Sequence, residues 1–541
     1  MKLLIIGGVA GGMSAATRAR RIDENAHIVV FERGPEVSFA NCGMPYFIGG
    51  EITDRAKMLV VTPQLLRDRF KLDVRPRTNV EHLDRVAKKV TVRDLATDRI
   101  YEESYDKLIL APGAAPLKPP ISGIELSGVF TLRNLQDMDR IKSVVDAGVK
   151  QAVVIGAGFI GLELVENFVR RGVATTVVEL QDQVMPPFDK EMTKPIVDEL
   201  RRRGATLLLG DAAEAFSAAP DGLNVKLKSG STLGAQLIIL GVGVRPENKL
   251  AVDAGLAVGP RGGIQVNEQM QTSDLDVYAV GDAVEIRDFV TGDPAQVPLA
   301  GPANRQGRIA ADHALGRQAR YRGTQGTAIV RVFDVIAAMT GASEKSLLRS
   351  RKPYHKAYVH PMQHASYYPG AQAMTLKLLY APETGKILGA QAVGGEGVDK
   401  RIDVLAVAIQ AGMTVYDLEE MELAYSPQYG SAKDPINMAG FVAANQLRDD
   451  HPYGHFTNLD PQATLLDVRT PREYAGGFVP GAINIPIDEL RGRVMELPRD
   501  RKVQVYCAVG MRGYLATRIL KQAGFDVMNL GGGYKTFQMM Q

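Results

Sequence analysis

Short apolar runs that lead into glycine-rich turns set the pattern of the chain. The run Leu3–Ile6 is followed by the turn Gly7–Gly12 and then by a segment, from about Met13 to Ile22, that we predict to be a helix. The run Ala152–Ile155 leads in the same way into Gly156–Gly161. Because a short apolar run bounded by glycine is typical of a buried strand, each unit is expected to fold as strand, turn and helix.

The first glycine turn is an incomplete dinucleotide-binding fingerprint. It keeps the first and third glycines, Gly7 and Gly12, but has Val9 where the second glycine belongs. A second predicted strand, Ala26–Phe31, ends at Glu32, where a carboxylate would accept hydrogen bonds from the ribose hydroxyls of an adenosine. We interpret the unit as an adenosine-binding turn; an ordinary glycine turn beside a solvated glutamate is the alternative.

The second glycine turn carries the complete fingerprint. Glycines stand in all three required positions of 156–161, and Glu163 opens the helix that follows. The next predicted strand, 175–178, ends at Glu179. A carboxylate there would repel a ribose 2′-phosphate and bond a free 2′-hydroxyl, so the sequence favours NADH over NADPH.

A third predicted strand ends in Gly281 and Asp282. A carboxylate at such a strand end can accept a hydrogen bond from the ribitol of FAD, although alone it would be an ordinary Asp-capped turn. Between the two glycine turns, residues from about 80 to 112 are expected to form a short antiparallel insert. The insert returns to a strand at 107–111, which Pro112-Gly113 closes.

Cys42 follows the first strand–turn–helix unit closely enough in the sequence to lie beside a flavin bound there. Cys42 lies in the stretch Ser38–Tyr46, where a thiolate could reach the isoalloxazine and be held ionised by charge transfer. A buried free cysteine that acts as a small hydrophobe is the alternative. A two-cysteine disulfide reductase would place its partner five residues on, but that position is Phe47. Cys42 must therefore exchange electrons with a sulfur that is not its neighbour.

Length, net charge and cysteine count exclude several classes of protein. A chain of 541 residues should divide into about three or four domains. The formal net charge of +3 gives no global basic field, so we expect no nucleic-acid partner. The 2 cysteines exclude a disulfide framework, and neither has a Cys or His at ligand spacing, so no metal site is expected. The first apolar run is too short for a signal peptide and no segment reaches a membrane span, so we expect a cytoplasmic protein without membrane contact.

The second cysteine lies in a separate pattern near the C-terminus. The predicted strand Val503–Tyr506 ends at Cys507, on a tight loop before a helix that we predict from about Tyr514. Backbone N–H groups and the helix N-terminus would point at the sulfur and stabilise an anionic persulfide. A dual-specificity phosphatase would also bring a cysteine and an arginine together on such a loop, as Cys507 and Arg512 are here.

These motifs resemble a known family in their order. Two dinucleotide units, with a Gly-Asp strand that closes the first after the second has been inserted, resemble the two-dinucleotide flavoprotein disulfide reductases over residues 1 to about 445. Ser38–Tyr46 resembles their single-cysteine group, which contains coenzyme A disulfide reductases, NADH oxidases and NADH peroxidases. The Gly7–Gly12 turn, Val9 included, resembles the coenzyme A disulfide and persulfide reductases. The motifs Asp467–Arg469, Gly481–Asn484 and Gly531–Tyr534 resemble a rhodanese domain.

The resemblance implies an α/β fold with two Rossmann-like dinucleotide-binding domains, an α/β dimerisation domain and a C-terminal α/β rhodanese domain. The implied division of the chain is an FAD-binding domain at 1–113 and 242–321, an NAD-binding domain at 114–241, a dimerisation domain at 322–445, a linker at 446–455 and a rhodanese domain at 456–541. Strands of the dimerisation domain are expected near 327–333, 373–380 and 386–393. The protein would be a homodimer with shared active sites, in which Tyr367 and Tyr425 reach the substrate sulfur of the other subunit and donate a hydrogen bond to the departing thiolate.

The resemblance also assigns the candidate site residues. For FAD these are Gly7, Gly8, Val9, Ala10, Gly11, Gly12, Glu32, Arg33, Cys42, Pro112, Gly113, Gly281 and Asp282. For NADH they are Gly156, Gly158, Phe159, Ile160, Gly161, Glu163, Glu179 and Gly243. For coenzyme A they are Ser14, Arg18, Arg21, Ser38, Asn41, Lys71 and Lys433. For the rhodanese loop they are Asp467, Arg469, Cys507 and Arg512.

The implied enzyme passes electrons from NADH through FAD to Cys42 and reduces coenzyme A disulfide, coenzyme A persulfide or polysulfide. Cys507 would carry sulfane sulfur as a persulfide. Two other functions stay open. One is an NADH oxidase or peroxidase in which Cys42 cycles through sulfenic acid, and the other is a sulfurtransferase on a structural flavoprotein scaffold.

Overall fold

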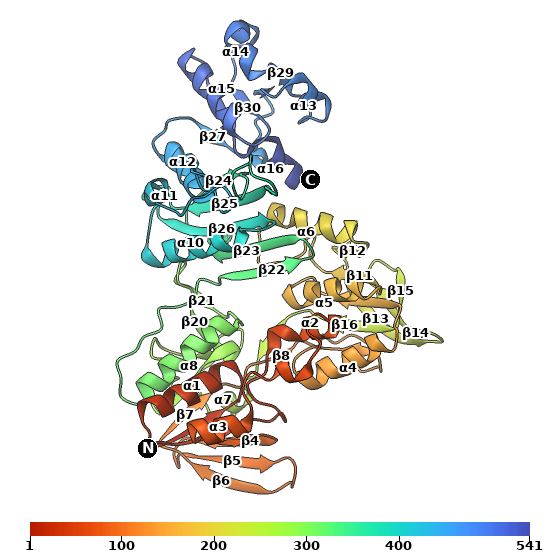
Figure 1. Cartoon of the computed structure of the whole chain (residues 1–541), viewed down its shortest axis with the longest axis vertical. Coiled ribbons are helices and arrows are strands. Elements are labelled where there is room, and N and C mark those ends of the chain that lie inside the picture. Colours follow the sequence, from red (N-terminus) through yellow and green to blue (C-terminus); the bar gives the residue numbers. More distant parts are fainter. The chain divides into compact units, whose positions relative to one another are not determined.

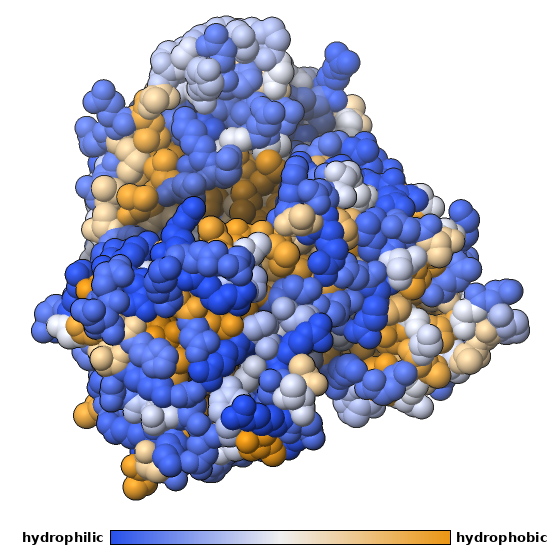
Figure 2. All heavy atoms as spheres, turned by 60° about the horizontal axis from the view of Figure 1, so that its bottom comes forward, coloured by the Kyte–Doolittle hydropathy of each residue, from blue (hydrophilic) through white to orange (hydrophobic).

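The computed structural model describes residues 1–541, which form two compact units (Figure 1). Unit 1 contains Met1–Gln183 and Arg201–Gly326, and unit 2 contains Val184–Leu200 and Thr327–Gln541. Hydrophilic residues make up most of the face drawn in Figure 2, and hydrophobic residues lie in patches between them. No helix has both the length and the apolar character that a membrane span requires.

The first sheet of unit 1 is parallel and has the strand order β19-β7-β1-β2-β3. Its strands are β1 (Lys2–Ile6), β2 (His27–Phe31), β3 (Asp73–Arg75), β7 (Lys107–Leu110) and β19 (Val277–Ala279). The side chains of Leu3, Leu4 and Ile5 are fully buried, as expected for a strand covered on both faces. The pairing of β19 with β7 confirms that the strand before Gly281 closes the first unit after the second has been inserted.

The second sheet of unit 1 is also parallel, with the order β12-β11-β10-β16-β9. Its strands are β9 (Val129–Phe130), β10 (Gln151–Ile155), β11 (Ala174–Glu179), β12 (Thr206–Leu209) and β16 (Leu237–Leu240). The helices of unit 1 are α1 (Ala10–Ile22), α2 (Met44–Gly49), α3 (Pro63–Phe70), α4 (Leu135–Asp146), α5 (Phe159–Arg170), α7 (Lys249–Asp253) and α8 (Ala300–Ala314). The first helix begins at Ala10, ahead of the predicted Met13, because the glycine turn itself forms its first turn.

Smaller sheets, most of them antiparallel, complete unit 1. The predicted insert is a three-stranded sheet of β4 (Thr78–Asp84), β5 (Lys89–Asp94) and β6 (Ile100–Ser104). The other antiparallel strands are β8 (Ala114–Pro116) paired with β17 (Val244–Pro246), and the meander β13 (Ala213–Ala219), β14 (Gly222–Leu227) and β15 (Thr232–Ala235). The last small sheet is mixed, because β20 (Val284–Arg287) pairs in parallel with β18 (Ile264–Gln265) and antiparallel with β21 (Pro294–Ala295).

Unit 2 contains an antiparallel sheet with the order β22-β23-β26-β25-β24. Its strands are β22 (Ala328–Val332), β23 (Val335–Gly341), β24 (His355–Val359), β25 (Met374–Tyr380) and β26 (Ile387–Gly394). The helices in this part of unit 2 are α6 (Lys190–Arg202), α9 (Glu344–Arg349), α10 (Val398–Ala411), α11 (Val415–Glu420) and α12 (Pro435–Leu447). Helix α6 belongs to unit 2 as far as Leu200. β22, β25 and β26 confirm the three predicted strands. β23 and β24 were not predicted.

A second sheet of unit 2 is parallel and has the order β27-β31-β30-β28-β29. Its strands are β27 (Tyr453–Gly454), β28 (Thr464–Asp467), β29 (Ile483–Asn484), β30 (Val503–Tyr506) and β31 (Val527–Leu530), and its helices are α13 (Pro471–Ala475), α14 (Ile487–Arg493), α15 (Met511–Gln522) and α16 (Gly533–Met539). The helix after the Cys507 loop begins at Met511, slightly before the predicted Tyr514.

Residues 446–455, where we expect a linker, have regular structure at both ends. Helix α12 runs to Leu447, and Tyr453–Gly454 forms strand β27 beside β31. Within unit 2, His360 Nε2 lies 2.8 Å from Thr536 Oγ1, which joins the antiparallel sheet to α16 of the C-terminal domain. The C-terminal domain is therefore docked on the antiparallel sheet through buried polar contacts.

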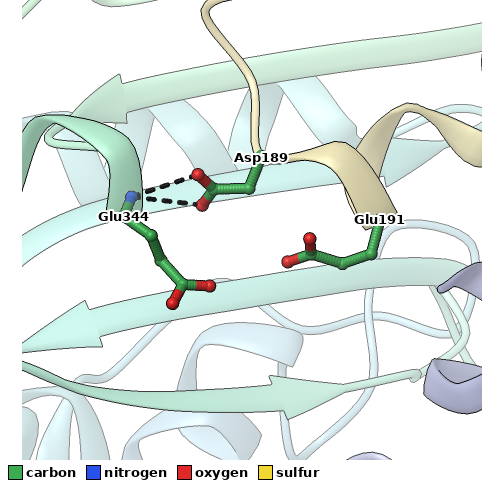
Figure 3. Close-up of side chains that lie close together, drawn as sticks. All are labelled: Asp189, Glu191 and Glu344. Atoms are coloured by element: carbon green, nitrogen blue, oxygen red, sulfur yellow. Dashed lines mark hydrogen bonds between the residues drawn. The ribbon is translucent and has the colours of Figure 1, made fainter. Parts of the chain in front are cut away.

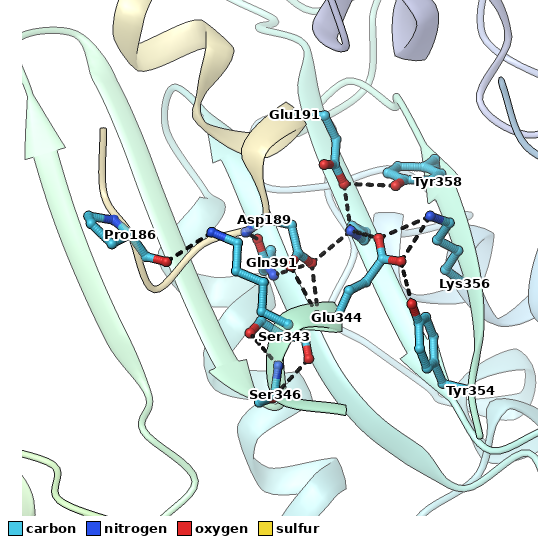
Figure 4. Close-up of polar contacts among 12 residues, drawn as sticks. Pro186, Asp189, Glu191, Ser343, Glu344, Ser346, Tyr354, Lys356, Tyr358 and Gln391 are labelled. Carbon is cyan, nitrogen blue, oxygen red and sulfur yellow. Dashed lines mark hydrogen bonds and ion pairs between the residues drawn. The ribbon is translucent and has the colours of Figure 1, made fainter. Parts of the chain in front are cut away.

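A buried ammonium group lies at the centre of the polar contacts of unit 2. Three carboxylates that could otherwise hold a cation, those of Asp189, Glu191 and Glu344, converge there (Figure 3). Lys377 is fully buried between them, with Nζ 2.7 Å from Asp189 and hydrogen bonds to the other two. Figure 4 shows further partners of these carboxylates, among them Tyr358 beside Glu191 and Lys356 beside Glu344. Burial alone would lower the pKa of Lys377, but the three carboxylates outweigh burial and raise it.

We predict that Lys377→Met destabilises unit 2 by about 3–5 kcal/mol, because the buried Asp189 and the partly buried Glu191 then lose their cation, and only Glu344 keeps one, Lys356. The shift of the unfolding midpoint in urea, measured at fixed protein concentration, checks this. Lys502→Met is the matched control, since Lys502 pairs with Asp526 at the surface at 3.7 Å and its loss should change stability little. Equal shifts for the two variants would contradict the central role of Lys377.

Candidate active site

Backbone packing fixes the shape of the first glycine turn. Gly7 has φ +106°, and a Cβ on it would lie 2.0 Å from the carbonyl oxygen of Ala111. A Cβ on Gly12 would lie 1.8 Å from the carbonyl oxygen of Gly7. The first and third glycines are therefore required by close approach of the helix to the strand, whereas Val9 immediately before α1 is accommodated.

The second glycine turn repeats this packing. Gly156 has φ +101°, and a Cβ on it would lie 2.4 Å from the carbonyl oxygen of Gly241. A Cβ on Gly161 would lie 2.2 Å from the carbonyl oxygen of Gly156. Gly158 has no atom within 4 Å of its Cβ position, so its backbone faces open space. This is the geometry that a diphosphate needs at the N-terminus of a helix.

The predicted ribose-binding carboxylates hold the same position in both turns. Glu32 accepts hydrogen bonds from the backbone N–H groups of Gly8 at 2.7 Å and Gly34 at 2.6 Å. Glu179 accepts them from Ala157 at 2.8 Å and Gln181 at 2.9 Å. The two carboxylates therefore brace the turns through the backbone, a role that we did not predict, and their remaining lone pairs can accept ribose hydroxyls.

Asp282 has the environment of a ligand-binding carboxylate. It lies in a one-turn 3₁₀ helix, Gly281–Ala283, directly after β19, and no protein group hydrogen-bonds its carboxylate. Burial alone raises its pKa. A partly buried acceptor at this strand end fits the ribitol hydroxyls of FAD. Arg33, by contrast, pairs with Glu247 at 3.1 Å.

Cys42 lies in an acidic environment. It is part of the 3₁₀ turn Asn41–Gly43 directly before α2, and the residue is exposed. Desolvation of the sulfur is the main cause that raises the pKa of the thiol, and the carboxylates of Glu163 and Asp282 raise it further. The protein alone therefore does not favour the thiolate, which leaves that role to an electron-accepting cofactor.

The candidate coenzyme A residues of unit 1 differ in their surroundings. Arg18 is part-buried and pairs with Asp312 at 2.6 Å, whereas Arg21 on the same helix is exposed. Ser38 and Lys71 both have left-handed backbone, with φ +50° and +48°. Asn41, next to Cys42, and Arg21, on α1, are exposed and therefore accessible to a ligand.

The two candidate tyrosines of unit 2 form a pair. The hydroxyl groups of Tyr367 and Tyr425 lie 3.0 Å apart, although the residues are 58 positions apart in the chain. Their exposed fractions are 74% and 50%. Lys433, in the same unit, is also exposed. Two adjacent exposed phenols are unusual at a monomer surface and suit a surface that meets a second subunit.

Cys507 lies beside a backbone donor at the start of a helix. It is only 1% exposed, and its sulfur accepts a hydrogen bond from the N–H of Gly510 at 3.1 Å, at the N-terminus of α15. Arg512 makes a two-pronged ion pair with Glu473, at 2.7 and 2.6 Å. Arg469 makes a similar buried pair with Asp467. We did not predict Glu473, although the spacing Thr470-x-x-Glu473 is that of a helix capping box and could have identified it.

Three known family models match successive parts of the chain. Residues 1–307 match the pyridine nucleotide-disulphide oxidoreductases, 327–434 match the dimerisation domain of that family, and 456–540 match the rhodanese-like domain. The chain belongs to the pyridine nucleotide-disulphide oxidoreductases. FAD and a nicotinamide nucleotide are the cofactors of this family, and the two glycine turns and Asp282 described above fit them.

Similar proteins cover nearly the whole chain. A coenzyme A disulfide reductase of Staphylococcus aureus strain JH9 is 38% identical over 444 residues, which are 82% of this chain and 99% of the relative. The crystal structure of reduced Bacillus anthracis CoADR-RHD has a TM-score of 0.97 and 46% identity and covers 99% of this chain and 98% of its own. An NAD-dependent persulfide reductase from A. fulgidus has a TM-score of 0.93 and 37% identity, with 99% and 100% covered. The predicted fold class, reductase family and rhodanese domain are confirmed.

We predict that Glu179→Gln raises the ratio of NADPH to NADH efficiency about tenfold, which corresponds to roughly 1.4 kcal/mol of lost repulsion against a 2′-phosphate. The neutral amide oxygen can still accept the N–H of Ala157, so the turn should keep its shape. Steady-state kcat/KM with each nucleotide checks this. Glu214→Gln, which alters a surface pair with Lys226, is the control, and an unchanged ratio in Glu179→Gln would refute the charge argument.

Proposed function

We propose that the protein is an NADH-dependent reductase of coenzyme A disulfide, coenzyme A persulfide or polysulfide that works through Cys42, with the rhodanese domain handling sulfane sulfur. The observation that carries the proposal is one exposed cysteine directly before α2, close to both Asp282 after β19 and Glu163 at the start of α5, whose charges raise the pKa of its thiol. Similarity to a coenzyme A disulfide reductase and to a persulfide reductase supports the substrate class.

The chemistry at Cys42 begins with its thiolate. The thiolate attacks one sulfur of the substrate, the S–S bond breaks, a mixed disulfide or persulfide forms on Cys42, and the other sulfur leaves as a thiolate that needs a proton. FAD supplies the electron transfer from NADH that restores Cys42. Glu32 and Asp282 would hold the adenosine and ribitol parts of FAD, and Glu179 would hold the ribose of NADH.

We propose that a homodimer completes the site. The Tyr367–Tyr425 pair would come from the second subunit and donate a hydrogen bond to the departing thiolate, since two phenols at 3.0 Å can share a proton between them. Arg21, Lys433 and the other cations of the coenzyme A set would bind its phosphates, together with Ser14, Ser38 and Asn41. Arg18 would contribute less charge because Asp312 already neutralises it. The expected location is the cytoplasm.

Cys507 would carry sulfur as a persulfide. A terminal persulfide anion would take the place of the thiol toward the N–H of Gly510 and the N-terminus of α15. The rhodanese domain is docked through β27 and the contact of His360 with Thr536, so it would not swing on a flexible linker. Sulfur could pass from Cys507 to Cys42 directly or on coenzyme A, and we propose coenzyme A as the carrier because its long pantetheine arm suits that role.

A second candidate function is peroxide or oxygen reduction, with Cys42 cycling through sulfenic acid. The similarity of a water-forming NADH oxidase from Lactobacillus brevis, with a TM-score of 0.80 and 27% identity, favours it. That structure covers 83% of this chain, however, and a function without sulfur leaves Cys507 and its loop without a role.

We expect Cys42→Ser to lower NADH-dependent turnover of coenzyme A disulfide and polysulfide by about three orders of magnitude or more while FAD stays bound. Cys507→Ser should lose sulfur transfer from thiosulfate or persulfide and keep coenzyme A disulfide reduction within about twofold, because that reaction needs only Cys42. Steady-state assays with the sulfur substrates and with peroxide, on both variants and wild type, measure this.

Two results would count against the proposal. Sulfur-linked turnover in Cys42→Ser equal to wild type would remove Cys42 from the mechanism, and peroxide as the preferred wild-type substrate would favour the second candidate. Sulfide release by the full chain from a sulfane donor, with coenzyme A stripped and then restored, tests the carrier. Undiminished release without coenzyme A would rule the carrier out.

A further inference from the structure

Helix α5 of the NAD-binding part packs closely against α2, the helix that begins just after Cys42. A Cβ on Gly49 of α2 would lie 1.7 Å from the side-chain oxygen of Asn167 on α5. The two helices are therefore in direct contact, and Glu163 near the start of α5 lies close enough to Cys42 for its charge to raise the pKa of the thiol.

Three carboxylates and one cation meet at this contact. Arg170 pairs with Glu166 at 2.6 Å and with Glu51 at 2.9 Å. Glu163, one helical turn before Glu166, accepts instead a hydrogen bond from the phenol of Tyr46 at 3.3 Å. Arg170 thus pairs with Glu166 and Glu51, whereas Glu163 faces the neutral hydroxyl of Tyr46.

No other cation balances Glu163. On α4, which also packs against α2, Lys142 pairs with Asp146 at 2.9 Å and lies over the ring of Phe47. Asp282 adds a further negative group near Cys42. Burial, with a smaller contribution from Glu166, raises the pKa of Glu163 to about 7, and the hydrogen bond from Tyr46 opposes this only in part.

The stoichiometry of the reaction needs one proton that NADH does not supply. Hydride brings two electrons and one proton, which convert Cys42–S–S–R into the Cys42 thiolate and one thiol, RSH. Attack of that thiolate on the next S–S bond forms a new bond to Cys42 and breaks the substrate bond. The second departing sulfur leaves as a thiolate and must take one proton from elsewhere.

We propose that Glu163 is the store of this proton, and that Glu163 and the Cys42 thiol share one negative charge over the cycle. Glu163 takes up a proton from solvent when the Cys42 thiolate forms. It releases that proton through its partner Tyr46 when the Cys42 thiolate is consumed. The departing substrate thiolate, held by the hydrogen bond of the tyrosine pair, takes up the released proton. The inference rests on the proposed redox role of Cys42 and adds a residue to it.

The arrangement explains why a carboxyl group is tolerated next to a thiolate. A fixed carboxylate at position 163 would repel the thiolate in a partly desolvated site, whereas a carboxyl group that protonates as the thiolate forms keeps the local charge constant. A permanent cation in place of Tyr46 would hold Glu163 ionised and remove this compensation.

The test is the pH dependence of Cys42 alkylation. The FAD-loaded full chain, reduced with dithionite so that nucleotide binding does not enter, is treated with iodoacetamide, and the Cys42 peptide is quantified by mass spectrometry. In Glu163→Gln we expect the apparent pKa of Cys42 to fall by about one unit, so that alkylation below that pKa is about tenfold faster. We also expect the pH profile of kcat to lose its ionisation near neutrality.

Matched variants separate this role from a structural one. Glu163→Asp keeps an acid and should retain most of the wild-type alkylation profile, and Glu125→Gln on the surface should not alter it. Tyr46→Phe should slow turnover while leaving the Cys42 pKa raised. An alkylation profile of Glu163→Gln that matches wild type would overturn the inference and leave the function of Cys42 intact. Full sulfur turnover in Cys42→Ser would instead overturn the proposed function.

Discussion

Close approach of helix to strand at the two glycine turns is the constraint on which the rest of unit 1 depends. In each turn a helix backbone packs so tightly on the turn that a single methyl group on Gly12 or Gly161 would collide with a carbonyl oxygen. A carboxylate, Glu32 or Glu179, then fixes the turn from the next strand. The start of α5, and with it the distance between Glu163 and Tyr46, follows from this packing.

The two cysteines are held by opposite electrostatic means. Cys42 is exposed and has carboxylates around it, so its ionisation depends on what binds beside it and on where a proton is kept. Cys507 is buried and has a backbone N–H and a helix N-terminus directed at its sulfur. These different surroundings suit the roles that we propose, in which Cys42 changes charge in each cycle and Cys507 holds an anionic persulfide.

The sequence was sufficient for the fold class, the order of the family regions and the strands beside the glycine turns, because glycine spacing and strand ends are local signals. Contacts between distant segments could not be predicted. Arg18 and Asp312 are 294 positions apart, and no pattern in either segment indicates their pairing. Lys377 lies in a strand that is buried along its whole length, where only the carboxylates from α6 and α9 explain a lysine. Strand β24 was not predicted because its first residues, His355 and Lys356, are polar and leave too short an apolar run to indicate a strand.

The junction before the rhodanese domain has a consequence for dividing the chain. The rhodanese-like match begins at residue 456, but the parallel sheet begins with β27, Tyr453–Gly454, which covers the edge of β31. A fragment cut at residue 456 would expose the unpaired N–H and C=O groups of β31, and such an edge invites pairing with another chain. The start of the rhodanese-like match is therefore not the boundary of the folding unit, which extends back at least to Tyr453.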